Sequence, residues 1–301
     1  MQKITEEISL LRKEKNAVIL VHNYQLPEVQ DIADFTGDSL ELARLSQKLD
    51  CKVILFCGVH FMAETAKILN PGKKILIPDL HAGCPMADMI TDQQLRREKE
   101  KHPGAAVVTY VNSTAEVKAL SDICCTSANG VKVVNSLRNE EIIFIPDKYL
   151  GSYVERQNKT KKFYLWSGYC PTHMVFSRSD IEKIKREHRT AEVLVHPECL
   201  IEVQEIADRI CSTSQMISYA KNSKTSEFII CTEVGMLYPL QKENPDKKFI
   251  AGSPNAICPN MKLNSLEKVL WALQDMKHEV HVDEAIRKQA LKAIEKMVAI
   301  T

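Results

Sequence analysis

The stretch E-V-Q-D-I-A-D at residues 28–34 returns 174 positions later, almost unchanged, as E-V-Q-E-I-A-D at residues 202–208. A weaker copy, E-V-K-A-L-S-D, lies between them at residues 116–122. The two strong copies also follow equivalent pairs, Val21-His22 and Val195-His196. Self-similarity at a fixed period is the sequence signature of a fold that is built from repeated units. The chain is therefore predicted to contain three copies of one structural unit.

Each copy of this stretch is followed by two further marks in the same order. A hydroxyl side chain comes five residues after each final Asp, at Ser39, Ser127 and Thr213. Further on comes a Cys-Pro pair, and the cysteines of these pairs, Cys84, Cys170 and Cys258, are 86 and 88 residues apart. Ten Cys and 12 Pro in 301 residues would give roughly 0.4 such pairs by chance. Three pairs at nearly equal spacing therefore belong to the repeat.

Short apolar runs alternate with amphipathic segments along the whole chain. Runs such as Ala17 to Val21 and Val53 to Phe56 are typical of strands that are buried on both faces. Strands that alternate with helices at this spacing predict parallel α/β units. We therefore expect an α/β fold of three α/β/α sandwich domains, each with a short parallel sheet of three strands. A pseudo-threefold axis would relate these domains, with the active site at their common centre.

Two charged linkers of helical character, at residues 96–103 and 183–190, suggest where the units divide. The predicted domains are residues 1–102, residues 103–188 and residues 189–301. The third domain would also carry two closing helices, from Ser265 to Met276 and from Asp283 to Met297.

Composition argues against several classes of protein. The formal net charge of +1 gives no general attraction to nucleic acid or to a membrane surface. No apolar run approaches the length of a membrane span, and the N-terminal segment lacks the apolar core of a secretory signal. Ten cysteines without such a signal predict reduced thiols and a cytoplasmic protein. The nucleotide-binding and hydrolase motifs G-x-G-x-x-G, G-x-x-x-x-G-K-[ST], G-x-S-x-G and H-E-x-x-H are all missing.

The three Cys-Pro cysteines support two kinds of metal centre. A structural zinc site usually needs a fourth ligand and closely spaced cysteine pairs, yet the chain has no C-x-x-C. His81 or His173 could complete a site of three Cys and one His. The alternative is a [4Fe-4S] cluster that is held by three cysteines, with one iron left open as a Lewis acid.

Polar side chains follow the first predicted strand of each unit, where ligands of parallel sheets bind. They are His22, Tyr24, Tyr110, Asn112, His196 and Glu198. We expect Tyr24, Tyr110, His196 and Glu198 to form an acid/base set, in which Glu198 abstracts a proton and the tyrosines donate or relay protons. Each of the hydroxyls Ser39, Ser127 and Thr213 taken singly is interpreted as a helix N-cap, but their equivalence across the repeat favours substrate binding. Three helix N-termini around one axis would suit a small anionic substrate.

A competing class is a non-catalytic or electron-transfer metalloprotein that holds zinc or iron. It explains the three Cys-Pro pairs but not the matched His, Tyr, Glu and hydroxyl side chains.

Taken together, nine short motifs over nearly the whole chain resemble the quinolinate synthase family, the iron–sulfur enzymes of de novo NAD biosynthesis. They are V-H-N-Y-Q (21–25), G-D-S (37–39), G-C-P-M-A-D (83–88), Y-V-N-S (110–113), G-Y-C-P-T-H (168–173), V-H-P-E-C (195–199), S-T-S (212–214), T-E-V-G (232–235) and C-P-N-M-K (258–262).

This resemblance implies a transferase-type condensation of iminoaspartate (iminosuccinate) with dihydroxyacetone phosphate, which gives quinolinate, phosphate and water. It implies that Cys84, Cys170 and Cys258 bind a [4Fe-4S] cluster, and that Tyr24 and Glu198 act as acid and base. It also implies functional coupling to an enzyme that produces iminoaspartate. The implied substrate-binding residues are His22, Ser39, Tyr110, Asn112, Ser127, His196, Glu198 and Thr213.

Overall fold

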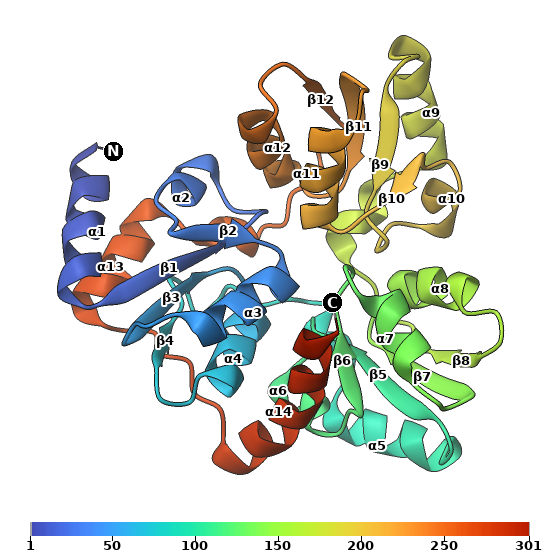
Figure 1. Cartoon of the computed structure of the whole chain (residues 1–301), viewed down its shortest axis with the longest axis horizontal. Helices are drawn as coiled ribbons and strands as arrows, with labels where there is room; N and C mark the ends of the chain where they lie inside the picture. The colour runs from blue at the N-terminus through green and yellow to red at the C-terminus, as the bar shows by residue number, and fades with distance from the viewer. Residues whose placement is uncertain (1, 301) are drawn as a thin grey trace.

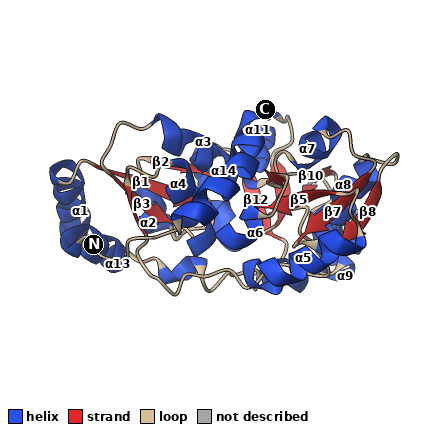
Figure 2. Ribbon diagram, turned by 90° about the horizontal axis from the view of Figure 1, so that it is seen from below, coloured by secondary structure: helices blue, strands red, loops and turns tan. Residues whose placement is uncertain are grey.

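The computed structural model describes residues 2–300, which form three parallel sheets around a common centre (Figure 1). Each sheet has four strands in the same order, β2-β1-β3-β4, β6-β5-β7-β8 and β10-β9-β11-β12. Every strand pair in these sheets is parallel. Seen from the side, helices α3, α7 and α11 lie above the sheets and α5, α9 and α13 lie below them (Figure 2). The predicted α/β fold of three repeated units is confirmed.

The elements follow one another in the same sequence in each unit. The first unit consists of α1 (Gln2–Glu14), β1 (Ala17–His22), α2 (Pro27–Asp31), β2 (Phe35–Gly37), α3 (Ser39–Lys48), β3 (Val53–Cys57), α4 (His60–Leu69), β4 (Lys74–Leu76) and the 3₁₀ turn η1 (Ala87–Met89). The second consists of α5 (Asp92–Lys101), β5 (Ala106–Tyr110), α6 (Ala115–Ala119), β6 (Ile123–Cys125), α7 (Gly130–Ser136), β7 (Glu141–Ile145), α8 (Lys148–Gln157), β8 (Lys162–Leu165) and η2 (Pro171–Val175). The third consists of α9 (Arg178–Glu187), β9 (Glu192–Val195), α10 (Ile201–Gln204), β10 (Arg209–Ile210), α11 (Thr213–Asn222), β11 (Glu227–Cys231), η3 (Val234–Met236), α12 (Leu237–Glu243), β12 (Lys248–Ala251) and η4 (Met261–Leu263). The closing helices are α13 (Leu266–Asp275) and α14 (Glu284–Ala299).

The Asp that ends each repeated stretch has the same structural role in all three units. Its carboxylate accepts the backbone N–H of a first-strand residue 15 positions earlier, at 2.8 Å in every case. Its own backbone N–H donates to the carbonyl of that same residue, so it is bound to the sheet edge twice. The three pairs are Asp34 with Ile19, Asp122 with Val107 and Asp208 with Val193. The repeated Asp therefore directs the chain from a short helix into the edge of the sheet.

This turn corrects the prediction of three strands in each sheet. The fourth strands, β2, β6 and β10, are only two or three residues long, too short for any periodicity to reveal. The helices that precede β2 and β10, α2 and α10, are only five and four residues long, because the chain must turn to reach the sheet edge.

The closing helices lie on the first two units, although they follow the third in the sequence. Helix α13 packs against α1 and β3, and α14 packs against α4, α6 and β6 (Figure 1). Four buried residues of α14 join the apolar cores of the first two units into one: Ala290, Ala293, Ile294 and Met297. The third unit has two apolar clusters of its own. The domain boundaries remain a prediction.

Among the described helices, none has both the length and the apolar character that crossing a membrane requires.

Candidate active site

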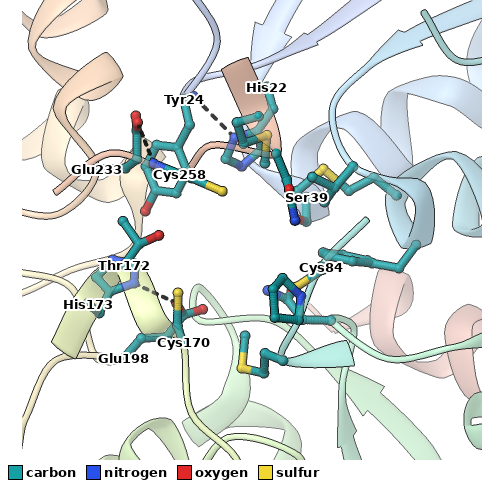
Figure 3. A pocket seen from close by; sticks show the side chains of 18 of the residues that line it. His22, Tyr24, Ser39, Cys84, Cys170, Thr172, His173, Glu198, Glu233 and Cys258 are labelled. Carbon is teal, nitrogen blue, oxygen red and sulfur yellow. Dashed lines mark hydrogen bonds and ion pairs between the residues drawn. The ribbon is translucent and has the colours of Figure 1, made fainter. Parts of the chain in front are cut away.

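One cavity of about 180 Å³ lies where the three units meet, and its wall contains residues from all of them (Figure 3). All twelve residues predicted for the site line this cavity: His22, Tyr24, Ser39, Cys84, Tyr110, Asn112, Ser127, Cys170, His196, Glu198, Thr213 and Cys258. The structure therefore brings the whole predicted set together, while the role of each residue stays a prediction.

The three Cys-Pro cysteines are partly exposed at this cavity, whereas the other seven cysteines are buried. Each lies at a turn whose following backbone N–H groups approach the sulfur, such as those of Met86 and Ala87 beside Cys84. Burial nevertheless raises the pKa of all three thiols, that of Cys84 to about 12. Since a bound metal cation stabilises the thiolate that coordinates it, these groups fit a metal centre with one Cys ligand from each unit.

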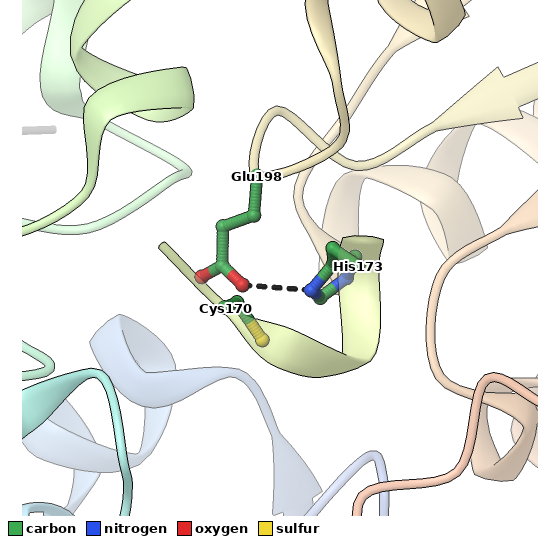
Figure 4. A group of neighbouring side chains, drawn as sticks. All are labelled: Cys170, His173 and Glu198. Carbon is green, nitrogen blue, oxygen red and sulfur yellow. Dashed lines mark ion pairs between the residues drawn. The ribbon is translucent and has the colours of Figure 1, made fainter. Parts of the chain in front are cut away.

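The two histidines considered as a fourth metal ligand differ in environment. His81 is exposed and does not line the cavity. His173 is buried, with Nδ1 2.8 Å from Glu198 Oε2 and Nε2 2.9 Å from Thr232 Oγ1. One potential ligand atom each of Cys170, His173 and Glu198 lie within 4.8 Å of one another (Figure 4). Nε2 has a hydrogen-bond partner in Thr232, whereas Nδ1 lies close to Glu198 without forming a hydrogen bond, so a site of three Cys and one His that uses this nitrogen stays a prediction.

The backbone fixes the tautomers of His22 and His196. The N–H of Tyr24 donates to His22 Nδ1 at 3.2 Å, and the N–H of Glu198 donates to His196 Nδ1 at 3.4 Å. Burial lowers the pKa of both imidazoles to about 3, although Glu198 acts to raise it. Each ring is therefore neutral near pH 7, with its proton on Nε2. Both histidines can donate hydrogen bonds to a bound anion.

Glu198 is buried and remains ionised. Burial acts to raise its pKa, but His173 and a hydrogen bond from the Tyr110 hydroxyl outweigh burial, so the pKa lies well below its ordinary value. Burial followed by the Glu198 charge raises the pKa of Tyr24 and of Tyr110, which therefore keep their protons. The cavity thus holds one carboxylate base and two phenol donors.

A continuous set of contacts joins the two tyrosines through this carboxylate. The Tyr24 hydroxyl is hydrogen-bonded to Thr232 Oγ1, and Thr232 contacts His173, which in turn contacts Glu198. Tyr110 completes the set from the second unit. The residues therefore form a chain of close contacts that crosses all three units.

The three hydroxyls are not helix caps, which corrects that interpretation. The cap is the preceding residue, Asp38 for α3 and Ser212 for α11, and each is part of a capping box. Ser39 and Thr213 are the first helical residues, so a neighbouring side chain does the capping in the first and third units. In the second unit, Ser127 lies three residues before α7, whose N-cap Asn129 makes no side-chain cap hydrogen bond. All three hydroxyls line the cavity.

Sequence reasoning missed several functional neighbours of these residues. Thr232, Glu233 and Lys262 all contact predicted site residues. The only signal for them was their place within the motifs T-E-V-G and C-P-N-M-K. Their partners lie in other parts of the chain, so no local pattern could have identified the contacts.

The fold and the cavity define a class of enzyme in which buried acid/base groups and three thiols lie together where three α/β units meet. The profile of the family described as "Quinolinate synthetase A protein" matches residues 6–299. The chain therefore belongs to the quinolinate synthetase A family and is an enzyme.

Full-length relatives support this assignment. The chain is 54% identical over 297 residues to the quinolinate synthase of Dehalococcoides mccartyi strain CBDB1, covering 99% of this chain and 98% of that protein. It is 51% identical over 300 residues to the quinolinate synthase of Thermodesulfovibrio yellowstonii, covering 100% and 99% of the two chains. The quinolinate synthase of Geobacter metallireducens is 54% identical over 297 residues, covering 99% of this chain and 97% of that protein.

Proposed function

We propose that this chain condenses iminoaspartate with dihydroxyacetone phosphate to give quinolinate, phosphate and water, as a step of NAD biosynthesis. The observation that carries the proposal is the meeting, in one cavity, of a thiol from each unit with an ionised carboxylate and two neutral imidazoles. Membership of a family whose named relatives are quinolinate synthases supports it. The reaction would take place in the cytoplasm, functionally coupled to an enzyme that produces iminoaspartate.

Binding of a dicarboxylate in this cavity would depend on neutral donors. Within residues 2–300, none of the residues that line the cavity is Lys or Arg. Helices α3 and α11 begin at the cavity wall, and the partial positive charge at a helix N-terminus favours a carboxylate. The hydroxyls of Ser39 and Thr213 and the Nε2–H of His22 add further donors. The wall therefore suits an anionic substrate without a cation beside it.

Cys84, Cys170 and Cys258 would hold a [4Fe-4S] cluster that has no fourth protein ligand. When bound, its open iron supplies a Lewis acid, which polarises a substrate oxygen and helps it to leave as water.

The acid/base residues would move the protons of the condensation and dehydration steps. The ionised Glu198 can accept a proton from a substrate carbon next to an imine or carbonyl. Tyr24, which keeps its proton, can donate it to a departing hydroxyl. Thr232 and His173 lie between the two groups, with hydrogen bonds from Tyr24 to Thr232 and from Thr232 to His173 and a 2.8 Å approach of His173 to Glu198, and would carry protons between them.

Purification without oxygen, followed by an assay with both substrates, tests this function. The wild-type protein should be brown, contain iron and sulfide, and form quinolinate. Cys84→Ala should lose both colour and activity, whereas Cys51→Ala, at a buried cysteine outside the cavity, should keep both. A colourless but active Cys84→Ala protein, or a wild-type protein that holds only zinc, would contradict the proposal.

A further inference from the structure

A buried ion pair lies beside the cavity, between Glu233, which lines the cavity, and Lys262, which does not. Neither residue is one of the acid/base groups described above. Glu233 follows strand β11, and its side chain has no exposed surface. Lys262 lies in η4, shortly after Cys258, and is mostly buried. Its Nζ lies 2.9 Å from Glu233 Oε1 and 3.0 Å from Glu233 Oε2, so the two oxygens share the cation.

Each member of this pair also binds the main chain of a predicted site residue. Glu233 Oε1 accepts the backbone N–H of Cys258 at 3.1 Å (Figure 3). Lys262 Nζ donates to the carbonyl oxygen of Tyr24, which belongs to the first unit. Two charged side chains therefore connect the backbone of a predicted iron ligand to the backbone of the predicted acid. We call Glu233 and Lys262 the clasp.

Gly235 makes room for the clasp. Its backbone N–H donates to Glu233 Oε2 at 2.7 Å. A Cβ at this position would lie 2.6 Å from the Tyr24 carbonyl oxygen and 2.7 Å from both Glu233 Oε2 and Lys262 Nζ. Any side chain here would collide with all three partners. The glycine of the T-E-V-G motif is therefore explained by the close approach of the clasp.

The clasp also joins two different units. Most buried apolar residues of the third unit belong to clusters separate from the core that the first and second units share, although Met261 belongs to that core. Hydrogen bonds between charged groups are short and directional, and are therefore suited to fix one backbone relative to another. Supporting contacts of this kind orient the ligands of metal sites.

We propose that Glu233 and Lys262 are positioning residues. They hold the backbone of Tyr24 in a fixed position relative to the backbone of Cys258, across the boundary between the first and third units. This inference rests on the proposed function for its kinetic consequences. Neither residue needs to touch the substrate for the clasp to act. Loss of the clasp should slow turnover, leave substrate affinity largely unchanged, and free the backbone at Cys258.

The experiment compares Lys262→Met and Glu233→Gln with the wild-type enzyme in two assays. In the reconstituted enzyme, each variant should lower kcat by about ten- to a hundredfold, as changes next to metal ligands commonly do, with KM nearly constant. In the metal-free protein, alkylation followed by peptide mass spectrometry should show faster modification of Cys258, with Cys84 and Cys170 unchanged. The double variant should lose no more than either single one, since both changes break the same contact.

Two matched controls separate positioning from a general loss of stability. Lys268→Met breaks the ion pair with Asp79, which lies away from the cavity wall, and should change neither kcat nor Cys258 alkylation. Gly235→Ala should reproduce the clasp variants with all charges retained, while Gly104→Ala, where a Cβ meets nothing within 4 Å, should be neutral.

Unchanged kcat in both clasp variants, or Cys258 alkylation that matches the wild-type rate, would overturn the inference. So would equal losses in Lys268→Met. If Lys262→Met fails to fold, Glu233→Gln and Gly235→Ala decide the question by the same measurements. The alkylation assay needs no catalysis, so it judges the clasp even if the wild-type enzyme forms no quinolinate.

Discussion

The turns after the first strands of the first and third units have the same backbone and carry different chemistry. In both, a His Nδ1 accepts the N–H of the residue two positions on, which is Tyr24 in one turn and Glu198 in the other. In both, a buried Gln amide donates to two carbonyl groups of the turn, from Gln30 and from Gln204. The repeat therefore supplies one rigid turn twice, and a single position in it decides whether the turn presents an acid or a base.

The second unit shows how far this turn can vary. Tyr110 stands where the other turns have His, and Asn112 stands where they have Tyr24 or Glu198. Lys118 replaces the glutamine and donates to the Ser113 carbonyl. Burial lowers the pKa of Lys118, and the nearby Glu64 of the first unit acts against this shift. The fold accepts a buried cation here because a neighbouring unit supplies a carboxylate.

The largest effect is expected from removing the base of the third-unit turn. Glu198→Gln keeps the shape of the side chain but cannot accept a proton, so kcat should fall by about 10²–10⁴-fold. Iron content should stay at the wild-type level, because no cysteine changes. Steady-state kinetics and iron analysis of the reconstituted variant measure both quantities. Full turnover would remove Glu198 from the mechanism.

The matched change in the first-unit turn is Tyr24→Phe. We expect a loss of about 10²-fold in kcat, at the low end of acid/base effects, since water can occupy the space of the missing hydroxyl and donate to Thr232. The same kinetic assay gives the ratio of the two losses. A larger loss for Tyr24→Phe than for Glu198→Gln would reverse the assignment of the dominant group.

A smaller effect, on stability, is expected from the glutamine that shapes the turn. Gln204→Leu removes two hydrogen bonds of 2.8 Å to buried carbonyls, and should destabilise the metal-free protein by about 2–5 kcal/mol. Denaturant unfolding measures the change. Gln241 also donates to loop carbonyls, but at an exposed site where water can replace it, so Gln241→Leu should cost below about 1 kcal/mol. Equal losses of unfolding free energy in the two variants would mean that burial of the turn does not increase the contribution of its hydrogen bonds.

The smallest effect is expected at the helix caps, where the first unit has Asp38 and the third has Ser212. Burial followed by the Glu41 charge raises the pKa of Asp38 above its ordinary value of 3.8. The native state therefore binds the carboxyl proton of Asp38 more tightly than the unfolded state does. The contribution of Asp38 to the free energy of unfolding falls as pH rises from the pKa of the unfolded state to the higher pKa of the native state. Asp38→Ser copies the third unit and removes the charge. Its stability relative to wild type should improve by about 1 kcal/mol between about pH 4 and about pH 7, measured by thermal unfolding. A pH-independent difference would contradict this account.

The sequence predicted the features of the fold and the site that recur at equivalent positions of the three repeats. Equivalent positions in the three copies identified the cysteines, the strand-end residues and the hydroxyls, and the fold places all of them at one cavity. It missed the cap residues by one position, because Asp38 and Ser39 are both good caps by residue type. It missed the contact of Lys262 with Tyr24, because such contacts depend on how separate units pack. The positions of α13 and α14 also depend on packing that chain order does not determine.

The shared core around α14 has a consequence for how the protein matures. Among the described elements, this helix is the last to be synthesised. The apolar core that it completes in the first two units stays open until then. A nascent chain therefore exposes part of this core to the quality-control machinery of the cell for most of its synthesis.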